Sequence, residues 1–300
     1  MNVQFSKPKR FGEIMDHTFT LSKQRFSDLF TILLILIGPI YILQAIIQLL
    51  SGVQFFRDVG NDGLWYEQMM TGLEETSTAT TSSLGGDIVM VLASIILYPV
   101  AEAAILIVIN HIKKAESYTV GSVIKKAFSR FWPILGSTIL FGLIAFGLII
   151  VPVIVISLAG VIGAIMNPVI GIVLGIVLFL GFAVVIGYLL TRWSFYFGAV
   201  VLEEDAPGLS RSWRLTRNRT WVLLALYIVF SLIIFAISAA MELSAGMLLG
   251  NSVFMTIIVN IVSLFTTMIF TVGYAVMFLD LKTRHDADDL KEMIEDYNDK

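Results

Sequence analysis

The most regular feature of the chain is a series of long apolar runs separated by short polar segments. Six runs each hold about 20 or more mostly apolar residues, at about 29–50, 88–112, 134–158, 168–191, 221–247 and 252–281. A helix needs about 20 such residues to cross the hydrocarbon core of a bilayer. The runs do not alternate apolar and polar residues, as a spanning strand would. The pattern therefore predicts an all-α, polytopic membrane protein with six transmembrane helices.

Composition supports this interpretation. Apolar residues make up 57% of the 300 residues and charged residues only 14%, whereas soluble domains have about 45–50% and 25%. The mean hydropathy is +0.86. A soluble core could not bury so much apolar surface, so lipid must be the solvent for much of the chain. No small-residue cleavage site follows the first run, so we expect it to remain as a helix and not to leave as a signal peptide.

Positive charge is distributed asymmetrically between the runs. Nineteen of the twenty Lys and Arg residues lie before the first run, after the second, after the fourth or after the sixth. With six spans these four stretches share one side of the bilayer, and the positive-inside rule makes that side cytoplasmic. The loop 51–87 on the other side is acidic, and its single Lys or Arg residue is Arg57. We therefore expect a cell-membrane protein with both termini in the cytoplasm.

A short basic segment precedes the first, third and fifth runs. Apolar residues recur along 120–131 at the spacing of one helix face, which predicts an amphipathic helix on the cytoplasmic surface. The segments 11–26 and 208–221 have similar patterns. The chain is therefore expected to be three units, each a surface helix followed by a transmembrane hairpin. The first segment's predicted apolar residues are Phe11, Ile14, Met15, Phe19 and Phe26.

The predicted domain organisation follows from these units. Residues 1–285 form a single six-span domain, with repeat units at about 10–112, 119–204 and 208–284, and residues 286–300 form an acidic cytoplasmic tail. In the extracytoplasmic loop 51–87, aromatic residues are expected to anchor the first half at the interface. These are Phe55, Phe56, Trp65 and Tyr66. The Ser-, Thr- and Gly-rich segment 76–86 is expected to be flexible.

Glu102 is the most unusual residue of the apolar runs, since it lies well inside the second. A carboxylate at such a depth costs about 2.5–3.5 kcal/mol on insertion scales, so it should face the bundle interior. One interpretation is a proton or cation site in a transport path, and the other is a neutral carboxyl hydrogen-bonded across helices near Pro99. Asn260 and Asn110 complete the candidate intramembrane polar site.

The basic segments supply a second set of candidates, for contact with lipid headgroups or phosphate. Arginine in particular pairs well with phosphate oxygens. The alternative is a solvated junction, in which the acidic run 203–205 pairs with the neighbouring arginines. The candidates are Lys125, Lys126, Arg130, Arg211, Arg214, Arg217 and Arg219.

Catalytic and metal-binding patterns are missing from the sequence. The chain has no cysteine, and its three histidines share no ligand spacing. Phosphate-binding loops, zinc-protease motifs and nucleophile elbows are likewise missing. We therefore expect neither an enzyme nor a bound metal or cofactor. The net charge of −3 gives no reason to expect nucleic acid. The expected partners are the lipid bilayer, its anionic headgroups and another membrane protein.

Three stretches resemble one known group of proteins: residues 12–26, Leu97–Ala104, and Val201–Glu203 followed by Ser210–Leu215. They are similar to the bacterial integral membrane proteins related to the membrane domain attached to some glycerophosphodiester phosphodiesterases. The resemblance implies a six-helix domain of largely unassigned function in the cytoplasmic membrane of a Gram-positive-type cell. The catalytic barrel of those enzymes is absent from this chain, so no active site is carried over.

Two functions are compatible with these observations. The first is a non-enzymatic membrane component with an accessory role in transport or envelope protection, acting through a partner protein or lipid. The second is a small secondary transporter or permease subunit that uses Glu102.

Overall fold

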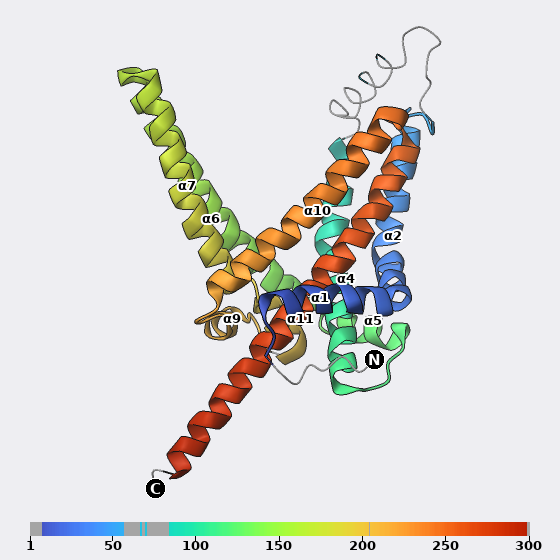
Figure 1. Ribbon diagram of the computed structural model, residues 1–300. Coiled ribbons are helices and arrows are strands. Elements are labelled where there is room, and N and C mark those ends of the chain that lie inside the picture. Colours follow the sequence, from blue (N-terminus) through green and yellow to red (C-terminus); the bar gives the residue numbers. More distant parts are fainter. Residues whose placement is uncertain (1–7, 57–66, 68–69, 71–83, 204, 299–300) are drawn as a thin grey trace. The chain divides into compact units, whose positions relative to one another are not determined.

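The computed structural model describes residues 8–56, 67, 70, 84–203 and 205–298, and within them the secondary structure is helical with no strand (Figure 1). Six helices are long and apolar enough to cross a membrane, which confirms the prediction of six long apolar helices and indicates a multi-pass membrane protein. They are α2 (Phe26–Leu50), α4 (Leu84–Lys114), α6 (Phe131–Met166), α7 (Pro168–Trp193), α10 (Thr220–Leu249) and α11 (Val253–Asn298).

Shorter helices connect or precede these six. They are α1 (Phe11–Gln24), α5 (Val120–Ser129), α8 (Tyr196–Gly198), the π-helical turn η1 (Ala199–Glu203) and α9 (Leu209–Leu215). The chain forms two compact units. Unit 1 contains Lys9–Ser129 and Ile228–Val276, and unit 2 contains Arg130–Tyr227 and Met277–Lys300.

The core of unit 1 is built on α4, which packs against α2 and α5. Nearly every side chain between Val100 and Ile109 is buried, and Glu102 is the half-buried exception. Small residues such as Ala101 and Ala104, both 0% exposed, allow neighbouring helices to approach α4 closely. Glu102 therefore lies in the buried part of α4.

Helix α1 buries one face and exposes another. The buried residues follow the i, i+3, i+4, i+7, i+8 spacing of one helix face and are Ile14, His17, Thr18, Leu21 and Ser22. Of the apolar residues predicted to share a face, Ile14 is buried, whereas Phe11, Phe19 and Phe26 are exposed. The apolar residues of this segment are therefore divided between protein packing and an exposed side.

His17 makes the stability of unit 1 depend on pH. Burial lowers the pKa of His17 from 6.5 to about 4, with help from Lys9 and against the opposing effect of Asp16. The unfolded chain thus takes up this proton more readily than the folded one, so stability is full above pH 6.5 and falls as the pH drops toward 4. Between neutral pH and pH 5, protonation of His17 should lower the free energy of unfolding of the wild type by about 1–2 kcal/mol, and His17→Met should not show this loss. Thermal unfolding of both proteins in detergent from pH 7.5 to 5 measures this, and parallel pH profiles would contradict it.

Helix α5 is also divided between two environments. Val123 and Ala127 are buried, whereas Lys125, Lys126 and Phe128 are exposed. One side of this short helix therefore packs on the protein and the other carries cations beside an exposed aromatic ring.

In unit 2, α6 and α7 pack against each other along their length. Asn167 ends α6 and caps α7, since its side chain accepts a hydrogen bond from the Val169 amide at 2.9 Å and Pro168 begins the helix. The helices touch where a Cβ on Gly163 would lie 2.8 Å from the Cα of Gly171. A Cβ on Gly175, four residues further along α7, would meet no atom within 4 Å.

The loop after α2 is described only in part. The backbone carbonyls of Gln54 and Phe55 accept hydrogen bonds from the first amides of α11 at 3.1 Å, and Phe55 and Phe56 pack against Phe254. The predicted anchors Trp65 and Tyr66 lie outside the described residues. So does the segment predicted to be flexible, except for its last three residues, which begin α4.

Candidate functional site

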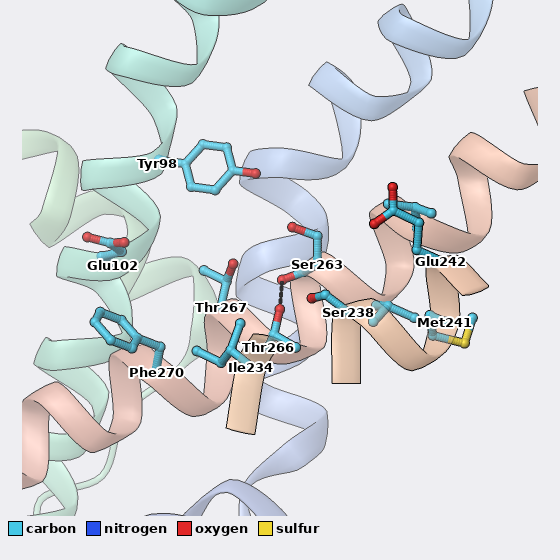
Figure 2. Close-up of a pocket in the computed structure, with 12 residues that line it drawn as sticks. Tyr98, Glu102, Ile234, Ser238, Met241, Glu242, Ser263, Thr266, Thr267 and Phe270 are labelled. Carbon is cyan, nitrogen blue, oxygen red and sulfur yellow. Dashed lines mark hydrogen bonds between the residues drawn. The ribbon is translucent and has the colours of Figure 1, made fainter. Parts of the chain in front are cut away.

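A cavity of about 400 Å³ lies between α4, α10 and α11 of unit 1 (Figure 2). Its lining combines two carboxyl groups, five hydroxyl groups and apolar side chains. The lining residues are Tyr98, Glu102, Ile234, Ser238, Met241, Glu242, Val259, Val262, Ser263, Thr266, Thr267 and Phe270. A space of this size falls in the range of small-molecule sites, which are mostly apolar with a few polar groups.

Helical spacing brings the polar groups to one place. Tyr98 and Glu102 are four residues apart on α4, so they lie on the same face one turn from each other. Ser238 and Glu242 have the same spacing on α10. In Figure 2 the two carboxyl groups lie at opposite ends of the lining, with the hydroxyl groups between them.

Glu102 lines the cavity without a polar partner among the described residues. Within the described part of the chain it makes no hydrogen bond or ion pair, and its side chain is half-buried among buried neighbours while lining the cavity. A carboxyl group in this position is stabilised by a proton or by a cation in the cavity. The site can therefore bind positive charge.

A hydroxyl network forms part of the cavity wall and joins three helices. The Tyr41 hydroxyl lies 2.6 Å from the Tyr98 hydroxyl and donates to Ser263 Oγ at 3.2 Å. Tyr41 is on α2, so the network links α2, α4 and α11. Next to it, Thr266 donates to the Ser263 carbonyl at 3.1 Å (Figure 2). These bonds hold the tyrosine ring of Tyr98 at the edge of the cavity.

Of the three polar residues predicted to form the intramembrane site, one lines the cavity. Glu102 lines the cavity, but Asn260 lies outside the lining and donates to Gln44 on α2 at 2.9 Å. Asn110 lies about two turns from Glu102 on α4 and does not contribute to the lining. Glu242 on α10, which was not among the predicted candidates, is exposed and also lines the cavity. Its spacing from Ser238 is the signal that could have identified it.

Several of the predicted basic candidates are used inside unit 2. Arg130 donates to the carbonyl of Val201 at 2.9 Å, and Arg211 pairs with Glu203 at 2.8 Å. Glu203 also binds Lys282 at 2.9 Å, so the acidic run does pair with a neighbouring arginine. Lys125, Lys126, Arg214 and Arg217 are exposed.

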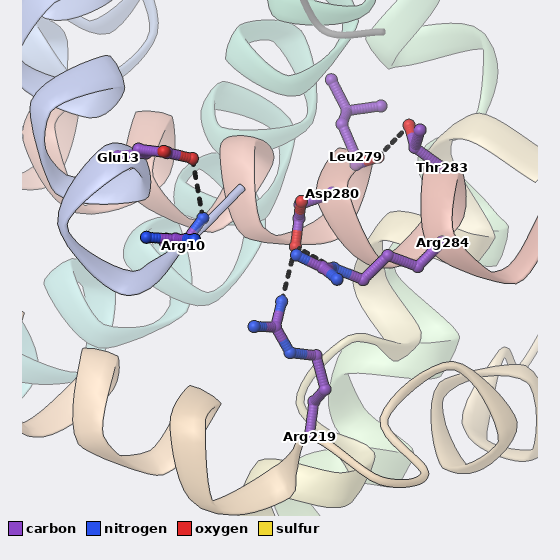
Figure 3. A network of polar contacts seen from close by, with 7 residues as sticks. All are labelled: Arg10, Glu13, Arg219, Leu279, Asp280, Thr283 and Arg284. Atoms are coloured by element: carbon purple, nitrogen blue, oxygen red, sulfur yellow. Dashed lines mark hydrogen bonds and ion pairs between the residues drawn. The ribbon is translucent and has the colours of Figure 1, made fainter. Parts of the chain in front are cut away.

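A second carboxylate in unit 2 is buried between two arginines. Asp280, whose side chain is 3% exposed, accepts from Arg219 at 3.1 Å and from Arg284 at 2.9 Å (Figure 3). Burial lowers the pKa of Arg219, and the nearby Arg284 charge acts in the same direction. The cluster joins the start of α10 to α11. Arg219 and Asp280 are 61 residues apart in the sequence, so no helical spacing could predict that they form a pair.

A family model described as a domain of unknown function, DUF7847, matches residues 32–280. The chain belongs to this family. The match includes every residue that lines the cavity and both ion-pair clusters apart from Lys282 and Arg284. Neither the curated proteins nor the solved structures gave a match.

The DUF7847 description names no activity. The resemblance to the phosphodiesterase membrane domain therefore stays a prediction. Within the described residues, no group of three or more His, Asp and Glu side chains is placed to hold a metal ion. The functional argument for this DUF7847 member depends on the cavity and on the charged side chains.

Proposed function

We propose that this chain carries small organic cations across the cytoplasmic membrane of a bacterial cell, and that Glu102 is the binding group. The observation that carries the proposal is the cavity of about 400 Å³ in which Glu102 has no partner among the described residues. Of the two functions predicted from the sequence, a cation transporter needs a carboxyl group in its cavity, whereas a purely accessory protein does not.

The chemistry of the lining favours an organic cation. The Glu102 carboxylate supplies negative charge, and the faces of Phe270 and Tyr98 can stabilise an ammonium group. Hydroxyl groups of Ser238, Ser263 and Thr267 can accept hydrogen bonds from the solute. The apolar residues provide contact for a hydrocarbon part.

The proposed topology has both termini in the cytoplasm and three hairpins, each preceded by a surface helix. It is supported by the nineteen of twenty cationic residues that fall on one side of the six spans. No catalytic role is proposed. The accessory function through lipid or a partner protein stays a second candidate, which the exposed cations of α5 and α9 favour.

Uptake into proteoliposomes tests the proposal. Vesicles with an inside-negative potential would be given radiolabelled tetraethylammonium or choline, with benzoate as the anionic comparison. We expect saturable uptake of at least one cation and none of benzoate. Glu102→Gln should lower cation uptake at least tenfold, because a neutral amide cannot replace the carboxylate charge.

Two further variants test whether the loss of cation uptake is specific to the Glu102 carboxyl group. Glu116→Gln, at an exposed position with 52% side-chain exposure, should leave uptake unchanged. Glu242→Gln should have a smaller effect than Glu102→Gln, because Glu242 is already exposed. Cation uptake no faster than in protein-free vesicles, or equal uptake by wild type and Glu102→Gln, would refute the proposal.

A further inference from the structure

The segment between α7 and α10 in unit 2 gathers arginines and tryptophans at the end of two apolar helices. Helix α9 packs against α7 (Figure 1), and this contact is organised by Arg192 at the end of the α7 apolar run. The Arg192 guanidinium lies 3.7 Å from the ring centre of Trp213 and donates to the Trp213 carbonyl at 2.9 Å. Ser212 donates to the Arg192 carbonyl at 2.7 Å. The segment is therefore held against the end of α7.

Arg192 of α7 and two arginines of this segment have no carboxylate partner among the described residues. In the part of the chain that the structure describes, Arg192, Arg214 and Arg217 form no ion pair with a carboxylate. Arg214 and Arg217 are both exposed and lie three residues apart on one backbone turn, in which the Arg217 amide donates to the Arg214 carbonyl at 3.2 Å. The local surface therefore carries excess positive charge.

Among the described carboxylates near this segment, Asp205 is exposed and forms no ion pair, and two others are already bound. Glu203 is bound by Arg211 and Lys282, and Asp280 is bound by Arg219 and Arg284. Each of these two carboxylates thus already has two cationic partners. Arg214 and Arg217 are therefore accessible to an external anion.

Exposed aromatic rings mark this segment as lying at the bilayer surface. Trp213 is 37% exposed and Trp221 is 61% exposed, and Tyr188 packs beside Trp221 with ring centres 5.5 Å apart. Tryptophan and tyrosine concentrate at the depth of lipid headgroups. The preceding part of α7 exposes Val184 and Val185, which can contact an acyl chain.

We propose that this segment binds an anionic phospholipid, with Arg214 and Arg217 holding its headgroup phosphate. Arginine suits phosphate because its guanidinium donates two parallel hydrogen bonds, and Arg192 adds charge while fixing Trp213. The apolar surface beside the arginines makes a lipid, and not free phosphate, the occupant. This site is independent of the Glu102 cavity.

Native mass spectrometry of the delipidated full chain tests the proposal. The protein in detergent would be mixed with phosphatidylglycerol or with phosphatidylcholine at matched concentration. We expect preferential retention of phosphatidylglycerol, and at least a fivefold lower bound fraction in the double variant Arg214→Gln/Arg217→Gln. The matched control Lys23→Gln/Lys114→Gln removes two exposed cations of unit 1 and should bind as the wild type does.

Thermal unfolding in the same detergent tests whether a lower bound fraction in the arginine double variant is caused by a folding defect. Lipid-free wild type and the arginine double variant should unfold at the same temperature, since both side chains are exposed and unpaired, and only the wild type should be stabilised by phosphatidylglycerol. Equal lipid loss in both double variants would show unspecific attraction and refute the site. Equal stabilisation by inorganic phosphate alone would refute the lipid assignment.

Discussion

Replacing Asp280 by Asn is expected to lower the stability of unit 2 by about 3–5 kcal/mol, the usual cost of removing one partner from a buried ion pair. The Asp280 side chain is 3% exposed and holds both Arg219 and Arg284. An amide would remove the carboxylate charge that both guanidinium groups bind. Their repulsion and incomplete hydration, more than the loss of a single contact, produce the effect.

Thermal unfolding in detergent, followed by intrinsic fluorescence, measures this loss. Asp205→Asn is the matched control, because Asp205 is an exposed carboxylate of the same unit. We expect the control to change stability by less than about 0.5 kcal/mol. The triple variant that also carries Arg219→Met and Arg284→Met should recover part of the loss, since it also removes the two positive charges that Asp280 binds. An Asp280→Asn protein as stable as the control would show that the arginines are adequately solvated without the aspartate.

The six apolar helices could be predicted from the sequence, whereas contacts between residues far apart in the sequence could not. Hydropathy predicts the six spans because lipid acts on each apolar run by itself. It cannot predict that Asp280 binds Arg219, because this pairing depends on how separate helices pack. The same limit applies to the exposed and buried sides of α1, whose phenylalanines resemble one apolar stripe in the sequence.

The cavity shows a similar division. Glu102 stands out from the sequence because a carboxylate is costly at that depth. Hydroxyl residues such as Ser263 and Thr267 do not stand out, since serine and threonine are tolerated in any membrane helix by bonding to their own backbone. Glu242 lies near the end of its run, where a charge needs no special explanation. Only the packing of α4, α10 and α11 brings these side chains to one space.

Gly198→Ala is expected to cost unit 2 about 3 kcal/mol, although it adds a single methyl group. A Cβ at Gly198 would overlap the ring of Phe278, with Cε2 and Cγ both 2.6 Å away. Phe278 is 0% exposed, so its ring has no free space to enter, and overpacking a dense core costs about 1–3 kcal/mol or more. Gly136→Ala on α6 is the control, because nothing lies within 4 Å of its added Cβ. It should be neutral or slightly stabilising, since alanine favours a helix over glycine.

The overlap predicts a specific coupling between Gly198 and Phe278. Phe278→Ala alone should cost about 3–5 kcal/mol, because it leaves a cavity in the core. In the double variant Gly198→Ala/Phe278→Ala the added methyl group no longer meets a ring, so the total loss should be smaller than the sum of the two single losses by at least about 1 kcal/mol. Unfolding temperatures of the four proteins in one detergent complete the cycle. Additive losses would mean that Gly198 is needed for a reason other than its contact with Phe278, and they would contradict the close approach of α8 and α11.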